Sequence, residues 1–444
     1  MNRKLKFVFS GLVKINIFLI FLFARSFTGL TIFNYRVGEY LVASTLFLLL
    51  AYSVLVPLLK KKYFLDSKPI NFAILALIFS FFLRILFSGI SINNEMIYKT
   101  SSYIWTFGAL AIGYYVLNEN NFQIRSEDTY LAFLGFVTIY IFSTRGISVN
   151  RQNLILNYTD KFEYPKGSDI LLAFIFIFYI FLNRKGFSQS SLCVFILFSS
   201  LFAPLFMVKS RSAFISLAIF ALLLTPYFIA NINSLNKYFY ICAVGSLIIF
   251  ILSTSWVVSR DIKIDEEISN DLKFAITSRY NTINDNPYEK EVLQLTLFYF
   301  EDGRIFSSDG NLNWRFQIWQ DIFNDMYKEG NLITGYGPVE NIPAMNSDQR
   351  VGQDGTNTNV HNYIVHILSR GGLLHLLFLT IIYYLLFKKF KSNNLSKDFY
   401  IIFIPLIFNS LFDPSMENSH YSVIMYLLMG LVLSNHKMLE KEDI

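Results

Sequence analysis

The chain contains 444 residues, of which 54% are hydrophobic, 18% aromatic and 16% charged, and its formal net charge at pH 7 is +6. Soluble domains carry roughly 25% charged residues, so this composition excludes an ordinary soluble protein and indicates one with many membrane spans. A nucleic-acid partner is also excluded, because the basic excess is not general: residues 257–358 hold 9 Lys/Arg against 17 Asp/Glu.

Twelve apolar segments approach the length of about 20 residues that a helix needs to cross a bilayer. They predict an all-α polytopic membrane protein with about 12 transmembrane helices. In chain order the predicted spans cover residues 7–24, 39–59, 70–90, 100–117, 128–144, 169–183, 188–208, 212–231, 238–256, 362–387, 398–412 and 420–436.

Basic residues predict how the spans are oriented. Lysine and arginine collect in alternate connections, at residues 3–6, 60–62, 184–185 and 388–391. The positive-inside rule places these connections, and both ends of the chain, in the cytoplasm. Arg145 and Arg151 then lie in an outward connection. A basic loop on that side indicates either a site for an anionic ligand or an exception, since orientation is a summed effect.

One long outward loop, residues 257–358, separates nine spans in residues 1–256 from three in residues 359–444. Loops of this length are commonly functional. Within it, residues 311–328 predict an amphipathic helix that Gly330 ends. Its apolar residues recur every three or four positions and are Trp314, Ile318, Trp319, Ile322, Phe323 and Met326. Such a helix can lie in the membrane interface and hold Arg315 at the depth of lipid phosphates.

His361 is the first candidate for catalysis. It follows the polar stretch 346–359 and stands at the start of an apolar segment, beside Asn362. Histidine titrates near neutral pH, so at this position it can accept a proton from a hydroxyl group at the membrane surface. The alternative is a structural histidine. His420, which also begins a predicted span, is the second choice.

Two arginines are candidates for binding an anion. Arg211 begins the predicted span at 212–231, and Arg315 lies in the predicted loop helix. The guanidinium fork matches phosphate oxygens, so two such groups near His361 would suit an anionic leaving group. The alternative for Arg211 is a side chain that snorkels to the headgroups. Arg84 lies within a span, where structural pairing is the favoured interpretation.

The sequence contains no residue cluster with metal-ligand spacing and no glycine-rich loop for a nucleotide. We therefore expect neither a metal ion nor another cofactor.

Four short patterns together resemble the O-antigen ligase/polymerase superfamily. They are Ser210-Arg211 before a span, Arg315 with Trp319, Gly335-Tyr336-Gly337, and His361-Asn362 followed by Gly372. The ligase pattern continues with Gly, Thr or Tyr where this chain has His375. That departure favours a polymerase slightly over a ligase.

The resemblance implies an inverting, metal-independent glycosyltransferase that works on the periplasmic side of the bacterial inner membrane. Its partners would be an undecaprenyl-diphosphate-linked oligosaccharide or polysaccharide and a lipid acceptor. A polymerase extends another lipid-linked repeat unit, whereas a ligase uses lipid A-core. His361 would be the base, and Arg211 and Arg315 would offset the charge of the leaving diphosphate. The residues expected to contact substrate are Asn362, Trp319, Tyr336, Arg145 and Arg151.

Two other functions stay open. Twelve spans with both ends inside also suit a transporter, such as a flippase for lipid-linked glycans, but the sequence shows no internal repeat. A non-catalytic assembly protein that uses the long loop for docking is the other alternative.

Overall fold

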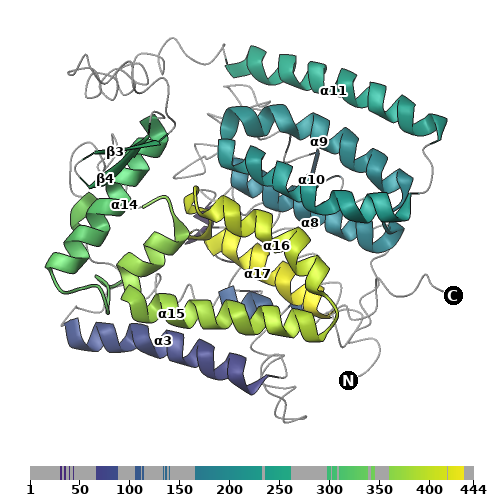
Figure 1. Ribbon diagram of the computed structural model, residues 1–444. Coiled ribbons are helices and arrows are strands. Elements are labelled where there is room, and N and C mark those ends of the chain that lie inside the picture. Colours follow the sequence, from purple (N-terminus) through teal and green to yellow (C-terminus); the bar gives the residue numbers. More distant parts are fainter. Residues whose placement is uncertain are drawn as a thin grey trace, which may run out of the picture. The chain divides into compact units, whose positions relative to one another are not determined.

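The computed structural model describes residues 67–88, 106–111, 113–114, 166–232, 236–261, 298–301, 303–307, 310–338, 342–345, 360–417 and 419–434, with a few further positions before residue 141. The described chain is mostly helical (Figure 1). It divides into two compact units, which we describe separately. The first comprises Met1–Leu75, Ser101–Val257 and Ile381–Ile444, and the second Ala76–Thr100 and Val258–Thr380.

Eight of the predicted spans coincide with helices. These are α3 (Lys68–Ser88), α8 (Gly167–Lys185), α9 (Gln189–Lys209), α10 (Arg211–Asn231), α11 (Lys237–Asp261), α15 (Tyr363–Ser392), α16 (Ser396–Ser410) and α17 (Ser419–Ser434). Among the described residues, α9, α10, α15 and most of α11 are long and apolar enough to cross a membrane. The described part is therefore that of a helical membrane protein. The predicted segments at 7–24, 39–59, 100–117 and 128–144 lie wholly or largely outside the described residues.

Aromatic side chains fill the core of the first unit. Helix α10 packs against α8, α9 and α16, and α8 also contacts α16 and α17. Three phenyl rings from α8, α9 and α10 meet there: Phe195 lies 5.0 Å from Phe178 and 5.9 Å from Phe220 between ring centroids. Such tilted and edge-on pairs contribute about 0.5–1.5 kcal/mol each beyond the area they bury.

Two glycines allow a close helix contact elsewhere in the first unit. A Cβ atom on Gly430 of α17 would collide with the carbonyl oxygen of Leu110 and lie 2.9 Å from the Cα atom of Gly113. A Cβ atom on Gly113 would collide with the Leu427 carbonyl in the same way. Small residues let membrane helices approach closely, so this contact depends on both glycines. The first unit also contains the short antiparallel pair β1 (Thr31–Ile32) and β2 (Tyr35–Arg36), and the 3-10 helix η5 (Pro414–Glu417).

The second unit contains a hairpin and the loop helix. Strands β3 (Phe298–Glu301) and β4 (Arg304–Ser307) pair antiparallel, with Glu301 opposite Arg304. Helix α14 (Gly310–Lys328) follows, and then the 3-10 helix η4 (Pro343–Met345). The amphipathic helix predicted at 311–328 is thus confirmed.

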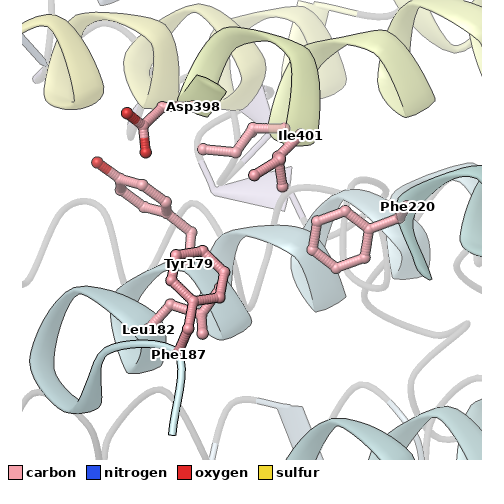
Figure 2. A pocket seen from close by; sticks show the side chains of 7 residues that line it. Tyr179, Leu182, Phe187, Phe220, Asp398 and Ile401 are labelled. Carbon is pink, nitrogen blue, oxygen red and sulfur yellow. The ribbon is translucent and has the colours of Figure 1, made fainter. Parts of the chain in front are cut away.

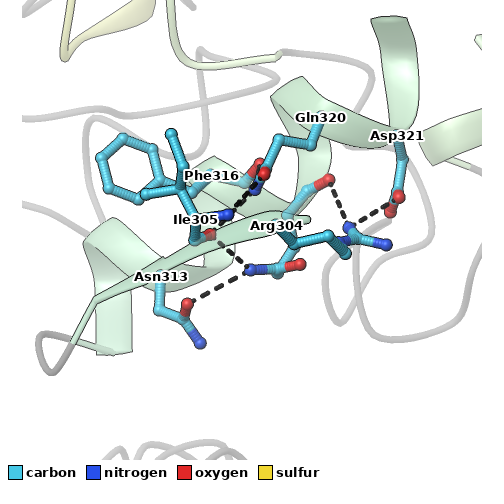
Figure 3. Close-up of polar contacts among 7 residues, drawn as sticks. Arg304, Ile305, Asn313, Phe316, Gln320 and Asp321 are labelled. Atoms are coloured by element: carbon cyan, nitrogen blue, oxygen red, sulfur yellow. Dashed lines mark hydrogen bonds and ion pairs between the residues drawn. The ribbon is translucent and has the colours of Figure 1, made fainter. Parts of the chain in front are cut away.

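The polar face of α14 is tied to strand β4 (Figure 3). Arg304 forms an ion pair of 2.7 Å with Asp321. The backbone N–H of Ile305 donates to the side chain of Gln320 at 2.7 Å, and that side chain donates back to the Ile305 carbonyl at 2.9 Å. Nearer the start of α14, the side chain of Asn313 accepts the Ser307 N–H at 3.1 Å. These reciprocal bonds fix both the distance and the rotation of α14 against the hairpin.

The apolar face of α14 is buried. Ile318, Ile322 and Met326 are fully buried in a cluster with Tyr336, Val360, Val365 and Leu368. Phe323 differs from the prediction, because its side chain is 48% exposed. The helix ends as predicted: Gly330 has φ of +72°, and the next N–H, from Asn331, donates to the Met326 carbonyl at 2.9 Å. This is a Schellman arrangement, for which glycine is the preferred residue.

Candidate functional site

The backbone at His361 adopts a conformation that is uncommon for a residue with a side chain. Its φ is +56°, in the left-handed region. The helix α15 starts directly afterwards, because the Asn362 side chain accepts the Val365 N–H at 3.0 Å and its carbonyl accepts the His366 N–H at 2.8 Å. Asparagine is among the strongest helix-capping residues. A left-handed conformation costs about 1–2 kcal/mol, so surrounding contacts must hold His361 in place.

Two tryptophans of α14 supply such contacts. The Trp319 indole N–H donates to the carbonyl oxygen of Val360 at 2.7 Å. The Trp314 ring meets the His361 ring edge-on, with centroids 5.2 Å apart and planes at 67°. The imidazole is therefore in contact with the Trp314 indole, and the backbone on either side of His361 is fixed by the Trp319 indole at Val360 and by the helix cap at Asn362.

Arg315 belongs to the same arrangement. It directly follows Trp314 and lies one helical turn before Trp319, so it shares a helix face with the residue that anchors Val360. Its side chain is half-buried, as is that of His361. The structure thus brings together His361, Asn362, Trp319 and the helix segment that carries Arg315.

Tyr336 lies under this site and not at its surface. Its side chain is only 4% exposed and is part of the apolar cluster beneath α14. Burial, reinforced by the nearby carboxylates of Glu329 and Asp325, raises the pKa of Tyr336 above its ordinary value. The hydroxyl is buried without a hydrogen bond of good geometry to any described residue. Tyr336 is therefore neutral at any physiological pH.

Helix α15 is broken at Gly372, where the sequence alone predicted one continuous span over 362–387. Gly372 has φ of +67° and ψ of −171°, which divides α15 into two helices. The segment 332–337, which follows α14, lies against the break. Tyr336 and Gly337 donate N–H groups to the carbonyls of Ser369 and Arg370, at 2.7 and 2.9 Å. The glycines at 335, 337 and 372 were the sequence signal for this contact.

On the other side of the break, the same segment accepts hydrogen bonds. Leu373 and Leu374 donate their N–H groups to the carbonyls of Leu332 and Ile333, at 2.9 and 3.2 Å. The Arg370 guanidinium, whose side chain is 5% exposed, also donates to the Gly337 carbonyl at 3.3 Å. The segment 332–337 therefore satisfies backbone groups on both helices that the break creates.

His375, where the sequence departs from the ligase pattern, has a packing role. Its Nδ1 lies 3.3 Å from the hydroxyl of Ser80 in α3, and that hydroxyl donates to the Leu77 carbonyl at 2.7 Å. The His375 side chain is 1% exposed and lies against Gly371, where a Cβ atom would collide with it.

Arg211 lies in the first unit, at the start of α10, and its side chain is exposed. Ser210 caps that helix by accepting the Ala213 N–H at 3.3 Å, and Ser212 donates to Asn409 at 3.2 Å. Arg145 and Arg151 lie outside the described residues, as does the polar stretch 346–359.

A separate small pocket lies in the first unit (Figure 2), and none of the predicted site residues lines it. Its walls are mostly apolar, and the Asp398 carboxylate and the Tyr179 side chain point toward one another across it. Asp398 is in the first turn of α16, where a helix N-terminus favours a carboxylate. In the part of the chain that the structure describes, no three His, Cys, Asp or Glu side chains are grouped as a metal site.

Comparison with known proteins connects these observations to a family. Residues 195–380 match a family model described as O-antigen ligase. The matched segment contains Arg211, Arg315, Tyr336 and His361, together with the broken part of α15. A comparison with curated proteins gave no match. This match over residues 195–380 supports the resemblance to the O-antigen ligase/polymerase superfamily that the sequence patterns indicated.

Proposed function

We propose that this protein is an inverting, metal-independent glycosyltransferase that moves a glycan from undecaprenyl diphosphate to an acceptor hydroxyl on the periplasmic side of the bacterial inner membrane. The observation that carries the proposal is the His361 site. A titratable, half-buried imidazole is held in a strained conformation beside a helix that presents an arginine, all within the matched family segment.

His361 is the general base in this proposal. The acceptor hydroxyl loses its proton to the imidazole as its oxygen forms a bond to the anomeric carbon of the donor sugar. Attack from the side opposite the phosphate inverts the configuration of that carbon. General-base help of this kind contributes about 10²–10⁴-fold to the rate. The contact with Trp314 and the cap at Asn362 support a fixed ring position, which proximity effects require.

Arg315 and Arg211 stabilise the leaving group. The bond between the anomeric carbon and the phosphate oxygen breaks, and negative charge develops on the departing diphosphate. Guanidinium groups placed at developing charge lower the barrier more than they stabilise the ground state. In this assignment Arg315 acts from α14 beside His361. Arg211 acts from the exposed start of α10, and Arg145 and Arg151 contribute from the loop that follows the fifth predicted span.

A polymerase is our first assignment, with another lipid-linked repeat unit as the acceptor. The observation that favours it is His375, which fills the position of Gly, Thr or Tyr in the ligase pattern and packs against Gly371 and Ser80. A ligase that transfers the glycan to lipid A-core is the second candidate. It is favoured by the description of the family model that matches residues 195–380.

Purified protein tests the enzyme assignment. We expect the wild type to lengthen or transfer glycan from a synthetic undecaprenyl-diphosphate oligosaccharide, without added metal and in the presence of EDTA. His361→Ala should lower the turnover number by about 10²–10⁴-fold, and the monodisperse protein should be recovered in normal yield. Transfer at the normal rate by a double His361→Ala, Arg315→Ala variant would show that the protein acts by another chemistry, such as transport.

A deletion strain separates the two acceptors. If the protein is a polymerase, the strain should make lipopolysaccharide capped with a single repeat unit. If it is a ligase, all capped lipopolysaccharide should disappear while lipid-linked polymer accumulates. Plasmid-borne wild type and His361→Ala serve as the positive and negative controls.

A further inference from the structure

The break in α15 leaves backbone groups that a membrane protein must satisfy internally. The last carbonyls of the half-helix 363–371 and the first N–H groups of the half-helix 373–392 have no partners within their own helices. In a low-dielectric environment each unsatisfied group costs several kcal/mol. Four of them, at Ser369, Arg370, Leu373 and Leu374, bond to the backbone of segment 332–337.

Segment 332–337 is also the continuation of α14. The end of this helix is fixed by Gly330 and by the bond from Asn331 to Met326, and Gly335 N–H then donates to the Asn331 carbonyl at 2.8 Å. The position of α14 therefore determines where segment 332–337 lies against the break in α15. Helix α14 is attached to the half-helix 363–371 at two points, through Trp319 and Val360 at one end and through segment 332–337 at the other.

The lengths of the two elements agree with this double attachment. From Trp319 to Lys328, α14 continues for about 14 Å, and the half-helix 363–371 is also about 14 Å long at 1.5 Å per residue. Between the two attachment points lie the buried side chains of Ile322, Met326, Val365 and Leu368. The arginine helix and the histidine half-helix thus form one packed pair that is bonded at both ends.

We propose that segment 332–337 is a positioning element of the active site: by bonding both sides of the break in α15, it holds the His361 half-helix in register with α14 and so aligns His361 with Arg315. The statement about alignment rests on the proposed function, whereas the statement about register concerns geometry alone. The positioning residues are Gly335 and Arg370. Gly335 acts through its backbone and Arg370 through its carbonyl and its guanidinium, and neither is expected to touch substrate.

Glycine at position 335 is required for two separable reasons. Its φ is +70°, and a Cβ atom would lie 2.5 Å from the Arg370 carbonyl carbon and 2.6 Å from its oxygen. Gly330 has almost the same φ, +72°, but a Cβ atom there would meet nothing within 4 Å. Gly330→Ala is therefore a matched control that carries the same backbone strain. Only Gly335→Ala also pushes segment 332–337 away from the break.

Tryptophan fluorescence gives a readout that does not depend on activity. The chain has four tryptophans, and Trp314 contacts the His361 ring. A protonated imidazole quenches an adjacent indole more strongly than a neutral one. We expect wild-type protein in detergent to show a pH-dependent change in fluorescence that His361→Ala removes. Gly330→Ala should retain this component, and Gly335→Ala should lose most of it.

Kinetic measurements test how this positioning affects the rate of glycan transfer. A misplacement of about 1 Å can cost 10²-fold in rate, so Gly335→Ala should lower kcat by about 10²-fold with KM within about two-fold of wild type. Gly330→Ala should keep at least half of the wild-type kcat. Arg370→Gln, which removes the guanidinium that donates to the Gly337 carbonyl, is the second variant if Gly335→Ala fails to fold. It should show a smaller loss of kcat, again with KM within about two-fold of wild type.

The results separate the two proposals. If wild-type protein transfers no glycan but the fluorescence pattern is as expected, the proposed function fails and the positioning element stands. If Gly335→Ala and Arg370→Gln keep both the His361-dependent fluorescence and the wild-type kcat, the positioning element is refuted. It is equally refuted if Gly335→Ala and Gly330→Ala lose activity to the same extent, or if the wild type shows no fluorescence component that depends on His361.

Discussion

Two sets of contacts in this protein, one from each unit, differ in kind. In the first, phenyl rings of α8, α9 and α10 interlock and two glycines let helices touch. In the second, side chains bond to backbone groups at defined atoms, as Trp319 does at Val360 and Gln320 at Ile305. Ring packing tolerates small changes in geometry, whereas directed bonds fix orientation. The second kind of contact surrounds His361, where orientation matters for chemistry.

Among the changes that test this comparison, the largest effect should come from Arg315, which lies among the directed contacts. Arg315→Gln should lower kcat by about 10²–10³-fold, because it removes a cation from the developing negative charge of the leaving group. Arg315→Lys should recover only part of this loss, since an ammonium lacks the planar fork. Glycan transfer by purified protein measures both. Lys328→Gln, an exposed change at the end of the same helix, is the control; a comparable loss there would point to general charge effects.

The close contact between Gly430 and Gly113 tests the helix packing of the first unit. Gly430→Ala should destabilise the protein by about 1–3 kcal/mol, because its Cβ atom would overlap the Leu110 carbonyl. Thermal unfolding in detergent should show a lower Tm, with unchanged transfer per folded molecule. Gly245→Ala in α11 is the matched control, since a Cβ atom there meets only Leu197, at 3.9 Å. Equal Tm values for the two variants would mean that the glycine contact does not form.

Trp319→Phe removes a single directed contact and keeps most of the ring. The Val360 carbonyl then loses its indole donor. A hydrogen bond contributes about 0.5–1.5 kcal/mol, so kcat should fall by a few-fold to about ten-fold. Trp256→Phe, in α11 of the first unit, should leave kcat unchanged. If Trp319 instead binds substrate directly, KM should rise and kcat should stay near the wild-type value.

The smallest effect is expected for Tyr336→Phe. The hydroxyl is buried without a well-formed hydrogen bond to a described residue, so its removal should change the unfolding free energy by less than about 0.5 kcal/mol or stabilise the protein slightly. Both kcat and KM should match those of the wild type. A raised KM would instead support substrate binding by this hydroxyl.

The length of apolar runs predicted eight helices that the structure describes, because a helix of about 20 apolar residues is what crosses a bilayer, and three- and four-residue periodicity predicted the loop helix α14. The sequence also located the start of α15 at His361. It did not reveal the left-handed conformation of His361 or the ring contact with Trp314. Those features depend on pairs such as Trp319 and Val360, which are 41 positions apart. The break at Gly372 was missed because the predicted span was drawn straight through Ser369-Arg370-Gly371-Gly372, between apolar residues on both sides.

The position of this break has a consequence for the membrane itself. Unbroken, the 30 residues of α15 would form a rod of about 45 Å, well beyond the roughly 30 Å hydrocarbon core of a bilayer. The portion after Gly372, residues 373–392, extends about 30 Å in total, and its apolar run to Phe387 covers about 23 Å before Lys388, Lys389 and Lys391. The preceding nine residues form a separate half-helix that takes another direction at the break. One glycine thus lets a single apolar stretch be both a bilayer anchor and the arm that carries the imidazole.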